Sequence, residues 1–422
     1  MDKASSSPAP STSEITGGHT IDISQYLNKG TVISSIDEVV ERYMTAAAGN
    51  LLFPFLACLT LIFDSQQAFI NVFSDKPPPW HCTSSTCDFS RPCNLPSNSS
   101  WSYSQPRKIS TISDFSLECS SPIRFALPGS SFYVGCLAGG LSLGTLADSR
   151  LGRKKTLVLS TLIMSIAAAL TTFSPNLAVP TSEPLLTSFP PNSSPGASAS
   201  TSTLSPLFFP LQPGGLYSVA RILWEKPWAL QRLVVILIGS FGIGLMYHGM
   251  LLNLWNLNAN LYISAALNAV AELPSALIIF FSSNVISRRR TLVQLTIVSG
   301  GCSLACAAMG GWSAVVFELV AFFGACTALY IERIYAVELF PTYVRNSAMA
   351  LQRQAVVLGG VAAPAMVALG RRGKVLSFGM FGIVIIFCGL FIMFLPETRG
   401  RAISDTMEEE ESKMMEGKII NN

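Results

Sequence analysis

A polar turn at residues 144–155, between two long apolar runs, contains one acid, four bases and two glycines. Its acid, Asp148, can interact with a helix N-terminus or with Arg153 across an interface, and making and breaking such contacts biases two conformational states. The alternative is that its four bases only anchor the turn at a membrane surface. The acid and the two glycines favour a gate over an anchor. The predicted gate residues of this turn are Gly144, Asp148, Gly152, Arg153 and Lys154.

Ionisable side chains inside apolar runs are the second chemical signal. Glu272 lies in the run near 260–281, where a charge costs at least about 2.5 kcal/mol at mid-depth and normally faces a cavity or a partner. Asn268 stands four residues earlier and shares its helical face. We therefore predict a substrate-binding site at Glu272 and Asn268, with a hydrogen bond to a neighbouring helix as the alternative. Glu318 also falls in an apolar run, and its partner is left open.

Further side chains have the chemistry to contact a charged solute. Arg353 suits a carboxylate, because guanidinium and carboxylate pair in a bidentate way; an Arg that extends to the membrane surface is the alternative. Asp64 would either attract substrate or face solvent. Aromatic residues near the ends of apolar runs would form a cation–π cage or serve as interfacial anchors. These are Tyr247, Trp255, Tyr262 and Phe281.

Opposite charges also gather where later apolar runs end. Glu338 and Arg345 flank a Phe-Pro pair, and Glu397 and Arg399 follow the last run. We expect a second ionic gate here, although exposed pairs are individually weak. The four acids at 408–411 are most simply a solvated acidic end.

Long helices must position these side chains. Half of the 422 residues are hydrophobic, 13% are charged and the mean hydropathy is +0.45, values typical of a polytopic membrane protein. Runs long enough to cross roughly 30 Å of hydrocarbon recur about nine times. The sequence predicts an all-α polytopic membrane protein with spanning helices near 45–70, 128–147, 156–174, 233–252, 260–281, 291–312, 314–331, 348–369 and 375–395.

The polar segment 74–124 has the chemistry of an extracytoplasmic loop. An even set of cysteines and an Asn-Ser-Ser acceptor crowd into it, which is typical of an oxidised loop with one of three disulfide pairings. Chance occurrence of the short acceptor motif is the alternative. The disulfide candidates are Cys82, Cys87, Cys93 and Cys119, and the glycosylation candidate is Asn98.

Clustered bases predict the sides of the membrane. Bases follow the second run and recur at 288–290, and such clusters in short loops mark the cytoplasmic side. The cysteine loop is then outside, and the tails 1–44 and 399–422 are cytoplasmic. Under this assignment the bases at 371–374 lie on the extracytoplasmic side, which is an exception to the rule that clustered bases are cytoplasmic.

The segment 175–232 creates a parity problem. Its Ser-, Thr- and Pro-rich part cannot form a packed element. The helix before it should end outside, whereas Arg221, Lys226 and Arg232 indicate that the next run starts inside. Because an irregular crossing exposed to lipid is forbidden, an odd number of spanning helices is missing.

Five motifs occur in a fixed order along the chain. They are Asp64-Ser65-Gln66-Gln67, Pro79-Trp80-His81-Cys82, Asn268 to Pro274, Glu338 to Thr342 followed by Val344-Arg345-Asn346, and Pro396 to Gly400. They resemble the organic cation/carnitine transporters, especially the plant branch. The turn at 144–154 resembles the loop between helices two and three of the major facilitator superfamily, to which these carriers belong.

The resemblance implies a major facilitator fold of twelve helices in two halves. It also implies secondary active transport of organic cations or carnitine-like zwitterions by alternating access, with a proton or sodium as coupling ion. This chain passes from what resembles helix three to the lead-in of helix seven, so helices four to six are missing. A non-transporting truncated membrane protein, from a splice form or an incomplete gene model, is the alternative. The predicted parts are a truncated half 45–174, a linker 175–232 and a six-helix half 233–398.

Two departures from the family pattern matter. Gly152 is the fourth residue after the acid instead of the third, and Val357 stands where animal cation carriers place an acid before Gly359-Gly360. The second departure argues against a simple cation preference.

Other classes of function lack support in the sequence. It shows no phosphate-binding glycine loop, no metal-ligand spacing among three histidines and no nucleophilic triad, so we expect no enzyme, metal or cofactor. The net charge of +3 is too small and dispersed for nucleic acid. The plasma membrane or the vacuolar membrane is the expected location, and a cell-surface recognition protein that uses the cysteine loop is a third possibility.

Overall fold

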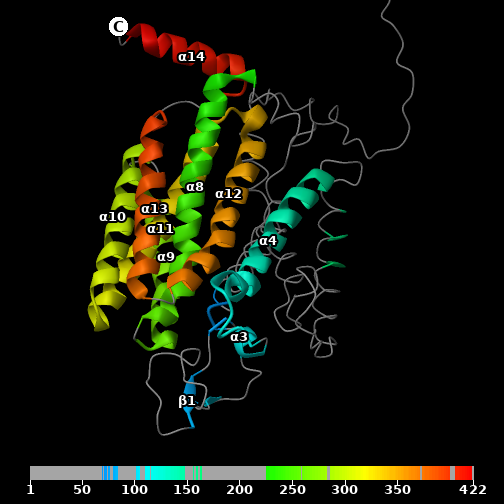
Figure 1. Ribbon diagram of the computed structural model, residues 1–422. Helices are drawn as coiled ribbons and strands as arrows, with labels where there is room; N and C mark the ends of the chain where they lie inside the picture. The colour runs from blue at the N-terminus through cyan, green and yellow to red at the C-terminus, as the bar shows by residue number, and fades with distance from the viewer. Residues whose placement is uncertain are drawn as a thin grey trace, which may run out of the picture. The chain divides into compact units, whose positions relative to one another are not determined.

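Figure 1 shows the computed structural model as a set of long helices packed side by side. The structure describes residues 69, 71–73, 75–76, 79–83, 101–104, 110–114, 116–147, 155, 158–159, 162–163, 225–257, 259–282, 286–370, 373–399 and 404–420. The predicted helix 45–70 lies outside these residues except for Phe69. Of the predicted helix 156–174, positions 158–159 and 162–163 are described, and they are helical.

Each predicted run of the second half corresponds to a helix. Five described helices are long and apolar enough to cross a membrane, namely α8, α9, α10, α11 and α13. The bounds are α8 Pro227–Asn253, α9 Leu261–Ser282, α10 Arg288–Ala308, α11 Gly311–Leu339, α12 Thr342–Leu369 and α13 Lys374–Phe391, with short 3-10 turns η5 Leu254–Asn256 and η7 Ile392–Phe394.

The helix limits differ from the predicted ones for local reasons. α8 begins at Pro227 instead of near 233, because a proline lacks the N–H that a first helical turn leaves unpaired anyway. α11 continues to Leu339 instead of ending near 331, because its acids Glu332 and Glu338 find partners on other helices.

The centre of the bundle is formed by α8 and α11, which are two-thirds buried over their apolar parts. α8 packs on α12, α13 and α11, while α10 packs on α11 and α13. Glycines bring α8 and α12 into backbone contact: a Cβ at Gly359 would lie 2.6 Å from the Phe241 oxygen, and one at Gly244 would lie 2.7 Å from Val356 Cα. Small residues at such crossings give membrane helices close van der Waals contact.

α4 (Pro122–Ala147) joins this bundle through α12. A Cβ at Gly360 would lie 2.6 Å from the Tyr133 ring, so glycine is required there for α4 to approach. The Ser130 hydroxyl donates to the Val361 carbonyl at 2.9 Å. α4 is therefore held by close packing and by an interhelical hydrogen bond.

Four small elements lie outside the long helices. The helices are α3 (Thr111–Asp114) and α14 (Met407–Ile420), and the strands β1 (Trp80–Cys82) and β2 (Trp101–Tyr103) form an antiparallel pair in the register Trp80↔Tyr103 and Cys82↔Trp101. The two-stranded sheet was not expected for an all-α chain; it lies within the predicted cysteine loop.

The outer faces of the helices are apolar. α9 is only 28% buried over its apolar part, and its exposed side chains include Val270, Leu273 and Phe281. In a soluble protein such a face would be an aggregation hazard. It suits contact with lipid, as expected for a multi-pass membrane protein.

Candidate functional site

Glu272 lies where α8, α9 and α11 meet. The hydroxyls of Tyr247 on α8 and Tyr330 on α11 each donate to Glu272 Oε1 at 3.4 Å, and the glutamate side chain is half-buried. In the same turn of α9, which contains Pro274, the Ser275 hydroxyl donates to the Glu272 carbonyl at 2.6 Å. A carboxylate beside two tyrosines can attract an organic cation through its charge, and aromatic ring faces can add cation–π attraction.

Aromatic rings extend this site toward α4. Tyr247 stacks on Phe322 with centroids 5.5 Å apart and contacts His248 edge-on at 5.0 Å. His248 contacts Tyr133 of α4 at 4.7 Å, and its Nδ1 lies 2.8 Å from the Gly244 carbonyl, to which it donates. The rings thus link the helix that carries Tyr133 to the Glu272 carboxylate.

Two arginines lie on the helices around the site. The Arg333 guanidinium is 5.9 Å from the centroid of the Tyr330 ring. Arg353, the predicted carboxylate partner, is half-buried on α12 between the buried Gln352 and Gln354. Positive charge is therefore available on α11 and α12, next to helices that also carry acids.

Asn268 does not pair with Glu272. Its Nδ2 donates to Glu318 Oε1 of α11 at 3.0 Å, and both side chains are almost completely buried. An interhelical hydrogen bond was the alternative to a substrate-binding role, and both residues make one: Asn268 bonds to α11, and Glu272 accepts bonds from α8 and α11. The Asn268 contact also identifies the partner of Glu318 that the sequence left open.

A third buried acid, Glu332, was missed by the sequence analysis. The Ser240 hydroxyl donates to its Oε1 at 2.7 Å and the Gln352 amide to its Oε2 at 3.4 Å, so it joins α8, α11 and α12. It was missed because the predicted run ended at 331, one residue too early. The apolar spacing of Ala336 and Leu339, both buried, was the available signal.

Charged groups of opposite sign meet at the end of the bundle where α9 ends and α10 begins, which we call the basic end. Arg288 Nη2 lies 2.9 Å from Glu338 Oε1, and Arg288 Nε lies 3.2 Å from both carboxylate oxygens. The Thr398 hydroxyl donates to Glu338 Oε2 at 2.6 Å. This cluster joins α10, the end of α11 and the segment after η7.

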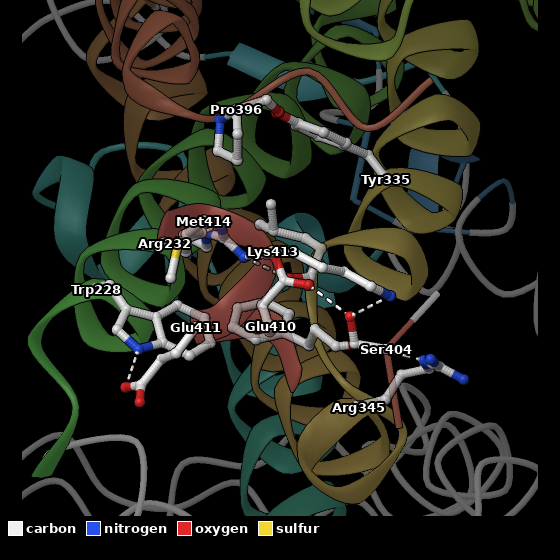
Figure 2. Close-up of polar contacts among 12 residues, drawn as sticks. Trp228, Arg232, Tyr335, Arg345, Pro396, Ser404, Glu410, Glu411, Lys413 and Met414 are labelled. Carbon is white, nitrogen blue, oxygen red and sulfur yellow. Dashed lines mark hydrogen bonds and ion pairs between the residues drawn. The ribbon is translucent and has the colours of Figure 1, made fainter. Parts of the chain in front are cut away.

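Glu397 caps the start of α10 in the same cluster. It accepts bonds from the Ser287 hydroxyl at 2.6 Å and from the Arg288 backbone N–H at 2.9 Å. Partial burial acts to raise the pKa of Glu397, but the bonds from Ser287 and from the backbone amides of Arg399, Arg288 and Thr398 outweigh it and lower that pKa. Nearby, the Tyr335 hydroxyl donates to the Pro396 carbonyl at 2.6 Å (Figure 2). The carboxylate thus stays ionised at the helix N-terminus, where the dipole favours it.

Comparisons with known proteins identify the family of the chain. Residues 83–185 match the family described as Sugar (and other) transporter. Organic cation/carnitine transporters 3 and 2 of Arabidopsis thaliana are 36% and 35% identical to the chain, over 90% and 92% of this chain and 94% and 96% of theirs. The chain belongs to the organic cation/carnitine transporter family. It is accordingly a multi-pass membrane transporter and not an enzyme.

Structural comparison supports the fold. The crystal structure of a D-xylose-proton symporter superposes on the chain with a TM-score of 0.52 at 14% identity, covering 68% of this chain and 92% of that one. At this identity the likeness shows a shared major facilitator fold and says nothing about substrate.

Several predicted residues of this family member lie outside the described part of the chain. Gly144 belongs to the last turn of α4. The structure does not describe the other gate residues Asp148, Gly152, Arg153 and Lys154. It also does not describe Asp64, the cysteines Cys87 and Cys93, or the glycosylation candidate Asn98. Cys82 lies on β1 and Cys119 is disulfide-bonded.

The second predicted gate of the transporter is built differently from the pairs seen in sequence. The partner of Glu338 is Arg288, whereas Arg345 donates through Nε to the Phe340 carbonyl at 3.3 Å. Arg399 contributes its backbone N–H to Glu397 at 3.5 Å. Proximity along the chain therefore does not identify the partners, because the folded helices bring α10 beside the end of α11.

The acidic tail is not simply solvated, which corrects the sequence-based interpretation. Figure 2 shows α14 lying across the start of α8. Arg232 pairs with Glu410 at 2.9 Å, and Glu411 accepts from Lys226 and from the Trp228 indole at 3.0 and 2.8 Å. The acids of the tail thus neutralise bases that precede and begin α8.

The four aromatic residues considered for a cage occupy different surroundings. Tyr262 and Phe281 are 70% and 79% exposed, and Trp255 stacks on Phe125 with centroids 5.9 Å apart. Tyr247 alone among the four bonds to Glu272. Within the described residues no group of three or more His, Cys, Asp or Glu could hold a metal ion.

Proposed function

We propose that the chain is a secondary transporter of organic cations or carnitine-like zwitterions and works by alternating access. The observation that carries the proposal is the Glu272 carboxylate, which accepts hydrogen bonds from the Tyr247 and Tyr330 hydroxyls. A quaternary ammonium group would be attracted by the carboxylate and by the ring faces. For a zwitterion, Arg353 would receive the carboxylate end. The names of the two Arabidopsis relatives support the same substrate class.

The basic end would act as the inner gate. Arg288, Glu338 and Glu397 hold three elements together there, and α14 adds Glu410 and Glu411. In an alternating-access cycle these contacts would form in one state and separate in another. A proton or sodium ion is the expected coupling ion, and the first gate around Asp148 would serve the same purpose in the first half.

Uptake of labelled carnitine and of labelled tetraethylammonium into cells that express the chain tests this proposal. Glu272→Gln should lower uptake at least about tenfold, because a cation held by a desolvated acid and aromatic faces gains about 2 kcal/mol or more. Glu332→Gln is the matched control, since it makes the same chemical change at a buried acid away from the rings. Surface labelling must show equal amounts of each protein. Uptake no higher than in untransfected cells, despite surface expression, would contradict the proposal.

A non-transporting truncated product is the second candidate, and the length of one alignment supports a missing internal segment. The alignment with carnitine transporter 3 extends over 489 positions, but 90% of 422 residues is about 380, so about 109 positions find no residue in this chain. At about 20 residues for each spanning helix, the gap has room for three helices and their loops. Helices four to six would be the missing ones, leaving about nine spans.

Sequencing the transcript across 174–219 separates the two candidates. Full-length messages with three additional apolar segments would make this chain an incomplete product of a transporter gene. A transcript that matches the chain would leave the uptake experiment decisive.

The proposal also predicts the side of the membrane on which the cysteine loop lies. The loop 74–124 would lie outside with its disulfides and with a glycan on Asn98, in the plasma membrane or the vacuolar membrane. A mobility shift after glycosidase treatment, absent in Asn98→Gln, would support this side assignment. Glycan-free protein at the cell surface would count against it.

A further inference from the structure

The pair formed by Glu318 and Asn268 is isolated in the apolar interior. Glu318 is 1% exposed and Asn268 is 0% exposed. Among the described residues, their side chains make one hydrogen bond, from Asn268 Nδ2 to Glu318 Oε1 at 3.0 Å. A buried ionised carboxylate needs a base or several donors to offset its lost hydration. One amide N–H does not meet that need.

The second polar atom of the amide shows what the pair lacks. Asn268 Oδ1 is buried and accepts no hydrogen bond, although buried acceptors nearly always have a donor. A carboxylic acid O–H on Glu318 would supply that donor and close a ring of two hydrogen bonds with the amide. The Asn268 amide could also be placed with Oδ1 and Nδ2 exchanged. Oδ1 would then face Glu318 Oε1, and these two acceptors could bond only if Glu318 carried a proton.

The described helices around Glu318 bring no Lys or Arg into contact with it. No Lys or Arg occurs in three stretches: α8 from Leu233 onward, the whole of α9, and α10 from Thr291 onward. The ionisable groups on these stretches are Glu272 and Tyr262 on α9, Tyr247 and His248 on α8, and the cysteines of α10. On α11 itself, Arg333 is fifteen residues further along, about 22 Å at the helical rise. α12 contributes Arg345 and Arg353, neither of which pairs with Glu318 in the described contacts.

The pair is linked mechanically to the candidate substrate site. Asn268 and Glu272 are one helical turn apart on α9, and Glu318 and Phe322 are one turn apart on α11. Tyr247 connects the two turns, since it stacks on Phe322 and donates to Glu272. A shift of α9 against α11 would therefore change both sites together.

We propose that Glu318 is the proton-binding site that couples transport to a proton gradient. This inference rests on the proposed function and names its coupling ion. A proton from the outer side bonds to the Glu318 carboxylate oxygen when that side is open. The neutral acid pairs with Asn268 in the closed bundle, and the same O–H bond breaks when water reaches Glu318 from the inner side. One proton crosses in each cycle and no other covalent bond changes.

Proteoliposomes that contain the full chain test the coupling. With the membrane potential clamped at zero, two pH units across the membrane should drive about 100-fold accumulation of carnitine or tetraethylammonium for one proton per solute. A protonophore should abolish this accumulation. Glu318→Gln, whose amide can donate to Asn268 Oδ1, should keep substrate counterflow and lose the response to the gradient. Glu332→Gln should keep both.

Counterflow tests the transport function, and accumulation driven by the pH gradient tests the proton coupling. Absence of counterflow in the wild type would sink the proposed transport function. Counterflow with no response to the gradient, or an equal response in Glu318→Gln, would overturn the coupling proposal.

Infrared spectroscopy tests proton binding without requiring transport. The purified wild-type chain at neutral pH should show the carbonyl band of a protonated carboxyl group that Glu318→Gln removes. Asn268→Leu should shift this band, because the acid loses its amide partner. A wild-type spectrum that lacks any band lost in Glu318→Gln would show an ionised Glu318 and would refute the proposal whatever the transport result.

Discussion

Acids in the apolar interior and acids at the basic end have opposite kinds of partner. Glu318 and Glu332 are bonded by neutral groups, an amide in one case and a hydroxyl with an amide in the other. Glu338 and Glu410 pair with arginines. The difference follows from solvation: a charge pair is tolerated where water is near, whereas an isolated carboxylate in the interior is costly. Glu318 is thus suited to binding a proton, Glu332 joins α8, α11 and α12 through neutral partners, and the acids at the end hold helices together.

Removing the base of the buried Arg288–Glu338 pair should have the largest effect. In Arg288→Ala the Glu338 carboxylate loses its base, and the side chains of this pair are only 9% and 22% exposed. We expect the free energy of unfolding in detergent to fall by about 3 kcal/mol, the lower end for a broken buried pair. Lys413→Met is the control, because Lys413 and Glu409 form an exposed pair. Equal melting temperatures for the two variants would break the proposed contrast.

Loss of the contact between the tail and α8 should have a smaller effect. Arg232 binds Glu410 and the Leu339 carbonyl and lies 4.8 Å over the Trp228 ring. Arg232→Met should cost about 2 kcal/mol, less than Arg288→Ala because α14 can undock and rehydrate its acids. The measurement is limited proteolysis of the tail together with thermal unfolding. A tail that resists protease as well as in the wild type would mean that these contacts do not hold α14.

A neutral replacement in the interior should have little effect on stability. Glu332→Gln keeps an oxygen for the Ser240 hydroxyl, and the Gln352 amide can turn to accept from the new N–H. We expect a change within about 1 kcal/mol, measured by thermal unfolding. A loss as large as that of Arg288→Ala would show that Glu332 is held as a charge, contrary to the comparison.

Acid pH should weaken the basic end through Glu397. The bonds at this carboxylate lower its pKa below the ordinary value of 4.5, so its contribution is complete above that value and is lost as the pH falls through the lowered folded-state pKa. The contribution is less than about 1 kcal/mol, because the group is partly exposed and screened. Glu397→Gln should flatten the stability profile below pH 4.5, as measured by melting temperature against pH. An unchanged profile would contradict the role of Glu397 as a cap of α10.

The helices and the family could be predicted from the sequence because both depend on local signals. Apolar runs of membrane length predicted α8 to α13 and α4, and the motifs around Asn268 to Pro274 and Pro396 to Gly400 indicated the family now shown by the relatives. The predicted limits of α8 and α11 were less accurate. α8 begins at a proline before its apolar run, and α11 continues beyond its apolar run because its acids bond to other helices.

Partners across helices could not be predicted in the same way. Glu338 stands seven residues from Arg345 in the chain, yet it bonds to Arg288, fifty residues away. Asn268 and Glu272 share a face of α9, but that face meets Glu318 at one turn and two tyrosines at the next. The tail acids were assigned to solvent because nothing near them in sequence reveals Arg232. Such contacts depend on which helices pack together, which sequence periodicity does not specify.

Substrate counterflow in proteoliposomes is the most direct test of the central claim that the acid and rings around Glu272 bind organic cations. Vesicles preloaded with unlabelled carnitine or tetraethylammonium should take up the labelled compound through the wild-type chain and through Glu332→Gln, and at least about tenfold more slowly through Glu272→Gln. Counterflow through Glu272→Gln at the wild-type rate, or none through the correctly inserted wild type, would contradict the account.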